Sequence, residues 1–270
     1  MPESGSPGFD AMRFALGVEY DGSDFSGWES QPGQRTVQST LESALSGVAD
    51  SPIEIVCAGR TDAGVHAVAQ VVHFDSHARR APHEWVLGAN SNLADDVSVR
   101  WASPVAENFH ARYSARCRYY RYVIQNRHVR PALLRRRAAW ERGALDIASM
   151  CSAGEHLLGE HDFSSFRAAG CQATSPVRTV VSLQVYRRDE LVIIDIAANA
   201  FLQHMVRNVA GALMEIGKGR REPAWAKELL EARDRTRGAA TAPPQGLYLT
   251  RVDYPPEYGL PAVSPEWLLW

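Results

Sequence analysis

Residues 57–66 read CAGRTDAGVH and lie between two apolar alternating segments, 52–56 (PIEIV) and 70–74 (QVVHF). Alternation of this kind is typical of half-buried strands, so the segment between them is predicted to be a tight loop that joins two strands. Its glycines allow positive φ and a close backbone approach to a ligand. Arg60 and Asp62 are therefore expected on a rigid rim. The residues alone leave open a plainer alternative, a polar turn with an exposed ion pair.

Further strands and helices are predicted on both sides of this loop. In the first half we expect strands at 14–21 and 97–105 and helices at 37–48 and 82–93, which with the two strands beside the loop gives the order β-α-β-β-α-β. The second half is predicted to contain a strand at 116–125, a helix at 146–158 with Asp146 as N-cap, an antiparallel strand pair at 177–187 and 190–197, a helix at 204–216, a helix that opens at 222–223 and a strand at 247–252.

These elements favour an α+β fold made of two similar split β-α-β halves. Mainly antiparallel sheets with helices on one face are the economical architecture, and a ligand is expected in a cleft between the halves. The predicted divisions are a disordered tail at 1–11, an N-terminal α+β half with the loop at 12–108, a C-terminal α+β half at 109–254 and a C-terminal tail at 255–270.

Composition is that of a soluble globular protein. The chain has 270 residues, of which 45% are hydrophobic and 22% charged, enough for a sizeable core. No apolar run is long enough to predict a membrane span, and the N-terminus lacks the basic start and apolar core of a secretion signal. The four cysteines are far apart and form no CxxC pair, so a disulfide framework or zinc site is not expected and a reducing cytoplasm fits best.

Positive charge is concentrated in one segment although the formal net charge is −2. Residues 112–142 contain ten arginines and one acid, Glu141, with tyrosines interleaved at 113, 119, 120 and 122. Basic stripes bind phosphates and aromatic side chains stack on bases, so this segment favours RNA as the partner. A solvated strand and loop is the alternative.

Five blocks in one order carry a family resemblance: EYDGSDFSGW (19–28), AGRTDAGVHA (58–67), FHARYSARCRYYRY (109–122), NAFLQHMVRN (199–208) and GLYL (246–249). The chain resembles the TruA-type tRNA pseudouridine synthases from about residue 14 to about residue 254. The resemblance implies two similar α/β halves around a positively charged cleft. It also implies a cytoplasmic, cofactor-free homodimer that isomerises uridine to pseudouridine at positions 38 to 40 in the anticodon arm of tRNA.

Asp62 and Arg207 are the first catalytic candidates. Without a cysteine nucleophile, a serine elbow or a metal set, a loop carboxylate is the best candidate for covalent or acid–base work. The resemblance implies that Asp62 attacks the target uridine, at C6 of the ring or at C1′ of the ribose. A helical wheel places Arg207 opposite the apolar face of 205–216, and an exposed arginine remains the alternative. The resemblance implies that Arg207 pairs with Asp62.

Tyr120 and Arg60 are expected to act on the base. Strand alternation turns Tyr120 away from Tyr119 and Arg121, and the resemblance implies that it stacks on the flipped uracil and handles the C5 proton. A core tyrosine is the alternative. Arg60 could fill the gap that a flipped base leaves, because its planar guanidinium stacks and binds phosphate. A partner for a local carboxylate is the other role open to it.

Other contacts to the RNA are expected from loops and from the GLYL block. Glu29 departs from the family pattern, which puts a phosphate contact there in doubt. The remaining predicted substrate-binding residues are Arg80, Phe109, His110, Ala111, Arg112, Tyr113, Gly170, Cys171, Gln172, Ala173, Thr174 and Leu247.

Two other function classes stay open on the residues alone. His73, Asp75 and His77 would share one face of a strand, with His66 nearby in sequence, and such a row could hold the metal of a hydrolase. A basic cleft without chemistry would instead suit an RNA chaperone.

Overall fold

The computed structural model describes residues 11–261; residues 1–10 and 262–270, parts of the two predicted tails, lie outside the described residues. Within the described range, ten strands form one sheet: β1 (Met12–Tyr20), β2 (Val56–Cys57), β3 (His66–Ser76), β4 (Val97–Pro104), β5 (Cys117–Asn126), β6 (Ala139–Glu141), β7 (Gly159–Asp162), β8 (Val177–Arg188), β9 (Leu191–Ala198) and β10 (Leu247–Asp253). The α-helices of this range are α1 (Val37–Ala49), α2 (Pro82–Asn92), α3 (Ile147–Glu155), α4 (Met205–Gly217) and α5 (Trp225–Ala232).

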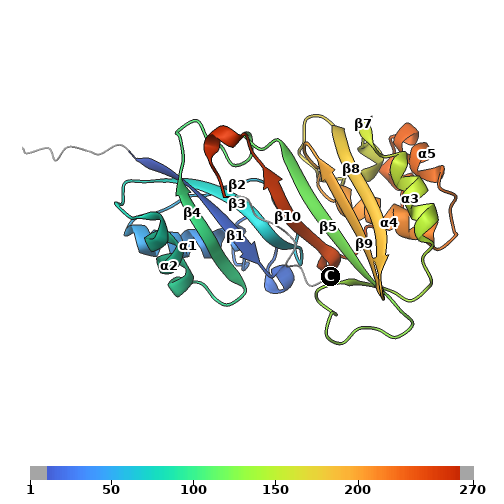
Figure 1. Ribbon diagram of the computed structural model, residues 1–270, viewed down its shortest axis with the longest axis horizontal. Coiled ribbons are helices and arrows are strands. Elements are labelled where there is room, and N and C mark those ends of the chain that lie inside the picture. Colours follow the sequence, from blue (N-terminus) through green and yellow to red (C-terminus); the bar gives the residue numbers. More distant parts are fainter. Residues whose placement is uncertain (1–10, 262–270) are drawn as a thin grey trace, which may run out of the picture.

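The strand order is β4-β1-β3-β10-β5-β9-β8-β7, with β2 paired to β3 and β6 paired to β5 (Figure 1). Only the β10–β3 and β5–β6 pairs among the described strands are parallel. The predicted α+β class and the mainly antiparallel pairing are therefore confirmed.

Strand β10 joins the two halves into a single sheet. Leu247 lies opposite Tyr122 in the antiparallel pair with β5, and Tyr248 lies opposite His66 in the parallel pair with β3. The sequence predicted a separate sheet in each half. Because the sheet is continuous, it fixes the position of the Asp62 loop relative to β5. The loop ends at His66, and β5 carries Tyr120.

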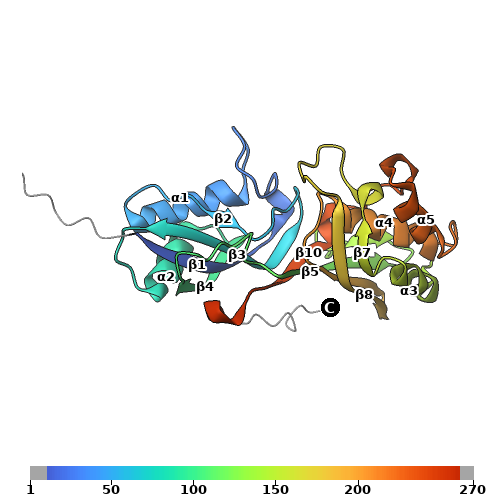
Figure 2. The same cartoon turned by 90° about the horizontal axis from the view of Figure 1, so that it is seen from above.

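The helices cover one face of this sheet, as predicted. One hydrophobic core runs along that face and takes Phe14, Val72, Leu249, Tyr122 and Ile194 from successive strands. Helices α1 and α2 pack against one end of it, and α3, α4 and α5 against the other, with β10 and β5 between the two groups (Figure 2). The five helices contribute Leu41, Leu45, Trp85, Met150, Leu213 and Leu229, among others.

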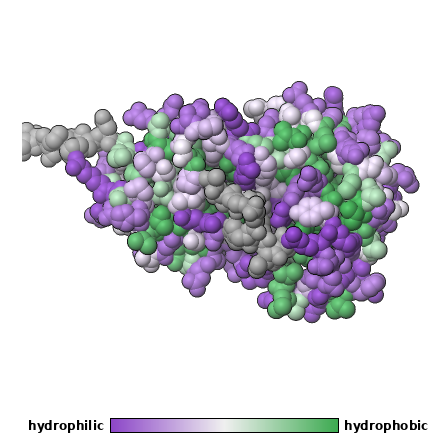
Figure 3. All heavy atoms as spheres, in the orientation of Figure 1, coloured by the Kyte–Doolittle hydropathy of each residue, from purple (hydrophilic) through white to green (hydrophobic). Residues whose placement is uncertain are grey.

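The other face of the sheet is covered by segments without α-helix. Phe109 and Ala111 pack there with Tyr254 and Tyr258, whereas Ala138, from the loop between β5 and β6, packs in a separate cluster with Val123 and Tyr248. The β5–β6 loop projects from the body of the molecule (Figure 1), and its surface is mixed, with hydrophobic as well as hydrophilic side chains (Figure 3); Val129 and Leu133 are exposed on it. Within the described range, no helix combines the length and apolar character needed to cross a membrane.

The predicted strand at 53–56 is mostly absent, since β2 contains only Val56 and Cys57. Ile53 and Ile55 are buried, but their backbone amides donate to Ser46 Oγ (2.9 Å) and Glu42 Oε1 (3.1 Å) of α1. Helix side chains thus satisfy these amides in place of a neighbouring strand. Burial was correctly predicted here, and strand pairing was not.

Candidate active site

Asp62 lies on the loop between β2 and β3, and its side chain is 25% exposed. Two glycines shape this loop. Gly64 has φ of 78°, a left-handed conformation that disfavours other residues. Gly27, with φ of 99°, lies behind the loop, where a Cβ atom would come within 3.1 Å of both Thr61 O and Ala63 N. The loop therefore packs closely against residue 27, and a larger side chain there would push the two apart.

Buried polar groups fix the loop to β1 and β3 through hydrogen bonds. The Thr61 hydroxyl lies 2.8 Å from the Tyr20 hydroxyl of β1, and both residues are buried. Gln70 of β3 is fully buried and donates through Nε2 to Gly59 O at 2.6 Å. These two contacts fix the stretch of the loop just before Asp62 and place the carboxylate before any substrate arrives, which is the form of preorganisation that catalysis favours.

Arg207 reaches Asp62 from α4, on the other half of the molecule. Its Nη1 donates to Asp62 Oδ2 at 2.8 Å and its Nε to Ala242 O at 2.8 Å, and its side chain is only 13% exposed. The structure therefore pairs the two residues, and the exposed-arginine alternative is wrong. The helical wheel had left exposure open for Arg207, but α4 is buried on nearly every side, including at Met214 opposite the apolar stripe.

His204 is a site residue that sequence reasoning missed. Its Nε2 lies 3.5 Å from Asp62 Oδ2, the same oxygen that Arg207 contacts. It is the N-cap of α4 with φ of 64°, a conformation that non-glycine residues rarely adopt and that is common at functional sites. The available signal was its spacing of three residues from Arg207, which places both on one helix face.

Tyr120 is buried at the edge of the same site. Its hydroxyl would lie 3.5 Å from a Cβ atom on Gly59, and its ring packs edge-on against Phe201 with centroids 5.0 Å apart. Burial raises the pKa of Tyr120, the Arg118 charge opposes this, and the Asp62 charge adds to it. The phenol therefore stays protonated near neutral pH.

Arg60 forms an ion pair with Glu29, with 2.9 Å between Nη2 and Oε1. The two side chains are 57% and 52% exposed, so water screens the pair and it is worth under about 1 kcal/mol. Of the two roles left open for Arg60, the structure shows the pairing with a local carboxylate. The partner, Glu29, is the residue that departs from the family pattern.

The linker segment 109–113 divides into buried and exposed parts. Phe109 and Ala111 are fully buried, so their side chains anchor the segment and offer no surface to RNA. Tyr113 is 75% exposed, Arg112 is exposed beside it, and the His110 and Tyr113 rings lie 4.3 Å apart. Only the exposed part is placed to contact a partner.

The other predicted binding residues lie in different places. Leu247 is buried beside Tyr122. Arg80 lies beyond the opposite end of β3 from Asp62 and donates to Val48 O at 3.2 Å. The structure therefore does not bring Arg80 together with the catalytic candidates.

The loop at 170–174 is organised by Arg167, which donates to the carbonyls of Cys171 and Ala173. Ala168 N donates to Gln203 O at 3.0 Å, which ties this loop to the residue before His204. Gly170, Gln172 and Thr174 are exposed, so the loop presents a surface close to the start of α4.

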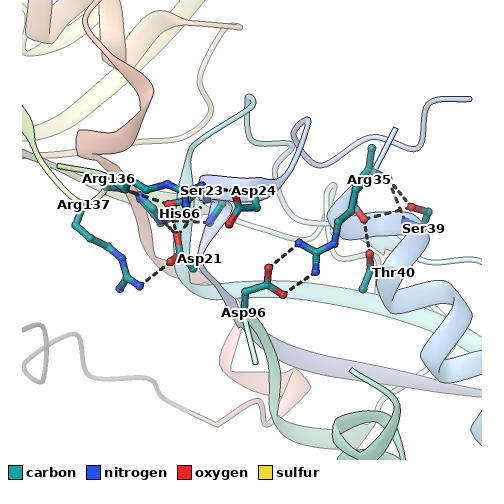
Figure 4. Close-up of polar contacts among 12 residues, drawn as sticks. Asp21, Ser23, Asp24, Arg35, Ser39, Thr40, His66, Asp96, Arg136 and Arg137 are labelled. Atoms are coloured by element: carbon teal, nitrogen blue, oxygen red, sulfur yellow. Dashed lines mark hydrogen bonds and ion pairs between the residues drawn. The ribbon is translucent and has the colours of Figure 1, made fainter. Parts of the chain in front are cut away.

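The arginine-rich segment does not form one free surface. Arg121, Arg127, Arg136 and Arg137 pair with Asp195, Glu190, Asp24 and Asp21 respectively. Figure 4 shows how Arg136 and Arg137 dock the β5–β6 loop onto the turn after β1, next to His66. This loop packs on the face that the helices leave uncovered, whereas Arg207 comes from the helix-covered face.

His66 is a second link between that loop and the N-terminal half. Its Nδ1 lies 3.0 Å from Asp21 Oδ1 and its Nε2 lies 3.0 Å from Arg136 O, and its ring stacks on Tyr248. Burial would raise the pKa of Asp21, but hydrogen bonds from His66 and Ser23 outweigh it and hold the pKa well below its usual value.

The row of His73, Asp75 and His77, which the sequence left open as a metal site, does not assemble. His73 Nδ1 accepts a hydrogen bond from Ala111 N at 3.1 Å, and Asp75 is taken by Arg13. Among residues 11–261, no three metal-ligating side chains gather in one place. This geometry argues against the hydrolase alternative.

Comparison with known proteins gives concordant matches. A family model described as tRNA pseudouridine synthase matches residues 17–114 and 153–255. A protein of Nitrosococcus oceani named tRNA pseudouridine synthase A is 59% identical over 259 residues, which cover 96% of this chain and 100% of that protein. Proteins of the same name are 56% identical in Methylococcus capsulatus (92% of each chain) and 53% identical in Coxiella burnetii (92% of this chain and 95% of that one).

Proposed function

Because the chain belongs to the tRNA pseudouridine synthase family, we propose that it isomerises uridine to pseudouridine at positions 38 to 40 in the anticodon arm of tRNA. The observation that best supports an active site here is the 2.8 Å contact between Arg207 and Asp62. It joins the two halves of the molecule, and buried hydrogen bonds fix the loop that carries Asp62. We assign the nucleophile to Asp62, because the ion pair stabilises the ionised carboxylate that attack requires.

The geometry at Asp62 distinguishes its two oxygens. Arg207 and His204 both approach Oδ2, and within residues 11–261 Oδ1 makes no hydrogen bond. Oδ1 is therefore the oxygen available to bond with the substrate, at C6 of the ring or C1′ of the ribose.

The proposed reaction is an isomerisation that balances without a co-reactant. The N1–C1′ bond breaks, a C5–C1′ bond forms, the C5 proton leaves and N1 gains a proton. Tyr120 is assigned to stack on the uracil, and its hydroxyl to take part in moving the C5 proton. Leu247 is assigned to pack against the same base.

The uridine must leave the helical stack before it can reach Asp62, at a cost of a few kcal/mol. Arg60, two residues before Asp62 and weakly held by Glu29, is assigned to fill the gap. We assign backbone contacts to the exposed residues of the linker and of the 170–174 loop. Homodimer formation and action in the cytoplasm belong to the same proposal, and light scattering of the purified protein tests the dimer.

Release of tritium from tRNA labelled at uridine C5 tests the proposal. We expect wild-type protein to release tritium in the presence of EDTA and Asp62→Asn to release none. Asp96→Asn is the matched control, because Asp96 is 26% exposed and pairs with Arg35 much as Asp62 pairs with Arg207 (Figure 4). This control is expected to retain wild-type turnover.

Two other outcomes would favour the rival functions. Tight tRNA binding without tritium release in any of the three proteins would indicate an RNA chaperone. Product formation that EDTA abolishes, without tritium release, would indicate a metal-dependent hydrolase.

A further inference from the structure

Arg118 on β5 is a buried cation held by backbone carbonyls. The residue is 8% exposed. Its Nη1 donates to Ala115 O (3.1 Å) and Asn199 O (2.8 Å), and its Nη2 donates to Ala58 O (3.1 Å) and to Arg112 O. Four carbonyls from three separate segments of the chain therefore converge on one guanidinium.

This guanidinium has no acidic partner within the described part of the chain, in contrast to Arg121 on the same strand, which pairs with Asp195 at 2.8 Å. Burial lowers the pKa of Arg118, because a desolvated cation is disfavoured. Burying a charge without a counter-ion is costly to stability. Hydrophobic packing does not explain a buried charge at this position. The role of Arg118 is therefore inferred from its hydrogen-bond contacts.

The carbonyls that Arg118 holds belong to the segments that build the active site. Ala58 directly follows β2 and is the first residue of the Asp62 loop. Asn199 follows β9 on the approach to α4, the helix that carries Arg207. Arg112 and Ala115 belong to the chain between β4 and β5, which includes the linker segment and connects the halves.

We propose that Arg118 is a positioning residue that holds the Asp62 loop, the approach to α4 and the linker at the spacing that the Asp62–Arg207 contact requires. The inference rests on the proposed function, because its main readout is the rate of pseudouridine formation. The planar guanidinium suits this task, since its fixed fork of donors reaches several carbonyls at once. A lysine at this position keeps the charge but has one ammonium on a flexible stem.

Arg118 is not assigned to bind phosphate. Both terminal nitrogens already donate to carbonyls, and the side chain is enclosed. A positioning role therefore predicts a loss of turnover at saturating tRNA, whereas a phosphate ligand would predict weaker binding and a smaller salt dependence of binding.

The test compares Arg118→Met and Arg118→Lys with Arg121→Met. Arg121 is the matched control, because it lies three residues along β5, is partly buried and turns to the other face of the strand to pair with Asp195, away from Asp62. Thermal unfolding first establishes a temperature at which each variant is folded. The kcat, the KM and the salt dependence of tRNA affinity are then measured at that temperature.

We expect Arg118→Met to lower kcat about 10²-fold, the scale of a misplacement of about 1 Å in an active site, and to change KM less than about threefold. Arg118→Lys should lose less, about tenfold, because the charge remains. Arg121→Met should lose stability and keep kcat within about twofold of wild type. The slope of log K against log salt should be unchanged in all three.

Three results would overturn the inference. One is a folded Arg118→Met with wild-type kcat, and if that variant does not fold, a wild-type kcat in Arg118→Lys serves equally. Another is a salt slope reduced by about 0.7 to 0.9, which marks one lost phosphate contact. The third is an equal loss of kcat in Arg121→Met. Failure of the proposed function is distinguishable, since wild-type protein would then form no pseudouridine.

Discussion

Replacement of Arg207 by alanine removes two hydrogen bonds at once, the 2.8 Å bond to Asp62 Oδ2 and the 2.8 Å bond to Ala242 O. Breaking a fully buried ion pair costs about 3–5 kcal/mol. The Arg207 and Asp62 side chains are 13% and 25% exposed, so water can partly solvate the orphaned carboxylate. We therefore expect Arg207→Ala to lower the free energy of unfolding by about 2–3 kcal/mol.

Urea unfolding measures this loss directly, and thermal unfolding gives a second estimate. For a chain of this size, each kcal/mol lowers Tm by about 2–4 °C, so a decrease of about 4–12 °C is expected. Turnover should fall by at least about 10²-fold at a temperature where the variant is folded, because the charge that stabilises the attacking carboxylate is gone.

The matched control is Arg35→Ala. Arg35 also pairs with an aspartate, Asp96, but its side chain is 42% exposed, so the loss should stay under about 1 kcal/mol. A double-mutant cycle isolates the contact: in an Asp62→Asn background, Arg207→Ala should cost less by about 1–2 kcal/mol. A coupling energy near zero, or wild-type turnover in Arg207→Ala, would refute the assignment of Arg207 to the site.

Two further predictions concern Tyr120 and His73. Tyr120→Phe keeps the ring and loses the hydroxyl, so tRNA affinity should stay within about twofold while tritium release falls about 10²-fold; unchanged release would remove the hydroxyl from the chemistry. Since the pKa of Tyr120 is raised, no loss of activity from its ionisation is expected between about pH 6 and pH 9. Burial lowers the pKa of His73 from 6.5 to about 4, so the unfolded chain takes up a proton that the folded protein does not. The stability that neutral His73 supports is therefore full above about pH 6.5 and falls by about 3 kcal/mol as the pH drops to about 4. His73→Asn, which keeps an acceptor for Ala111 N, should flatten that decline in urea titrations at several pH values, and an equal decline in both proteins would contradict the reasoning.

The sequence predicted most elements because their signals are local. The α1 helix follows its apolar spacing, α3 follows the Asp146 cap, and β5, β8 and β9 follow their alternation. Strand β10 was placed correctly along the chain, but its parallel pairing with β3 depends on contacts between residues far apart in sequence. Contacts between distant residues produce no periodic pattern in the sequence, so this pairing could not be predicted from it.

The sequence predicted the site residues that belong to a motif and are themselves assigned to the chemistry. Asp62 and Arg207 do meet, although the helical wheel left an exposed Arg207 open, because α4 is buried on nearly every side. The supporting groups were missed. Gln70 and Arg118 lie in strands that read as ordinary alternation, and only the fold shows that their polar ends reach the backbone of the catalytic loop.

Mapping of pseudouridine in tRNA after incubation with wild-type protein and with Asp62→Asn tests the central assignment most directly. We expect pseudouridine at positions 38 to 40 with wild-type protein, and unmodified uridine at those positions with an Asp62→Asn protein that is folded and still binds tRNA. Pseudouridine formed at the wild-type rate by Asp62→Asn would contradict it.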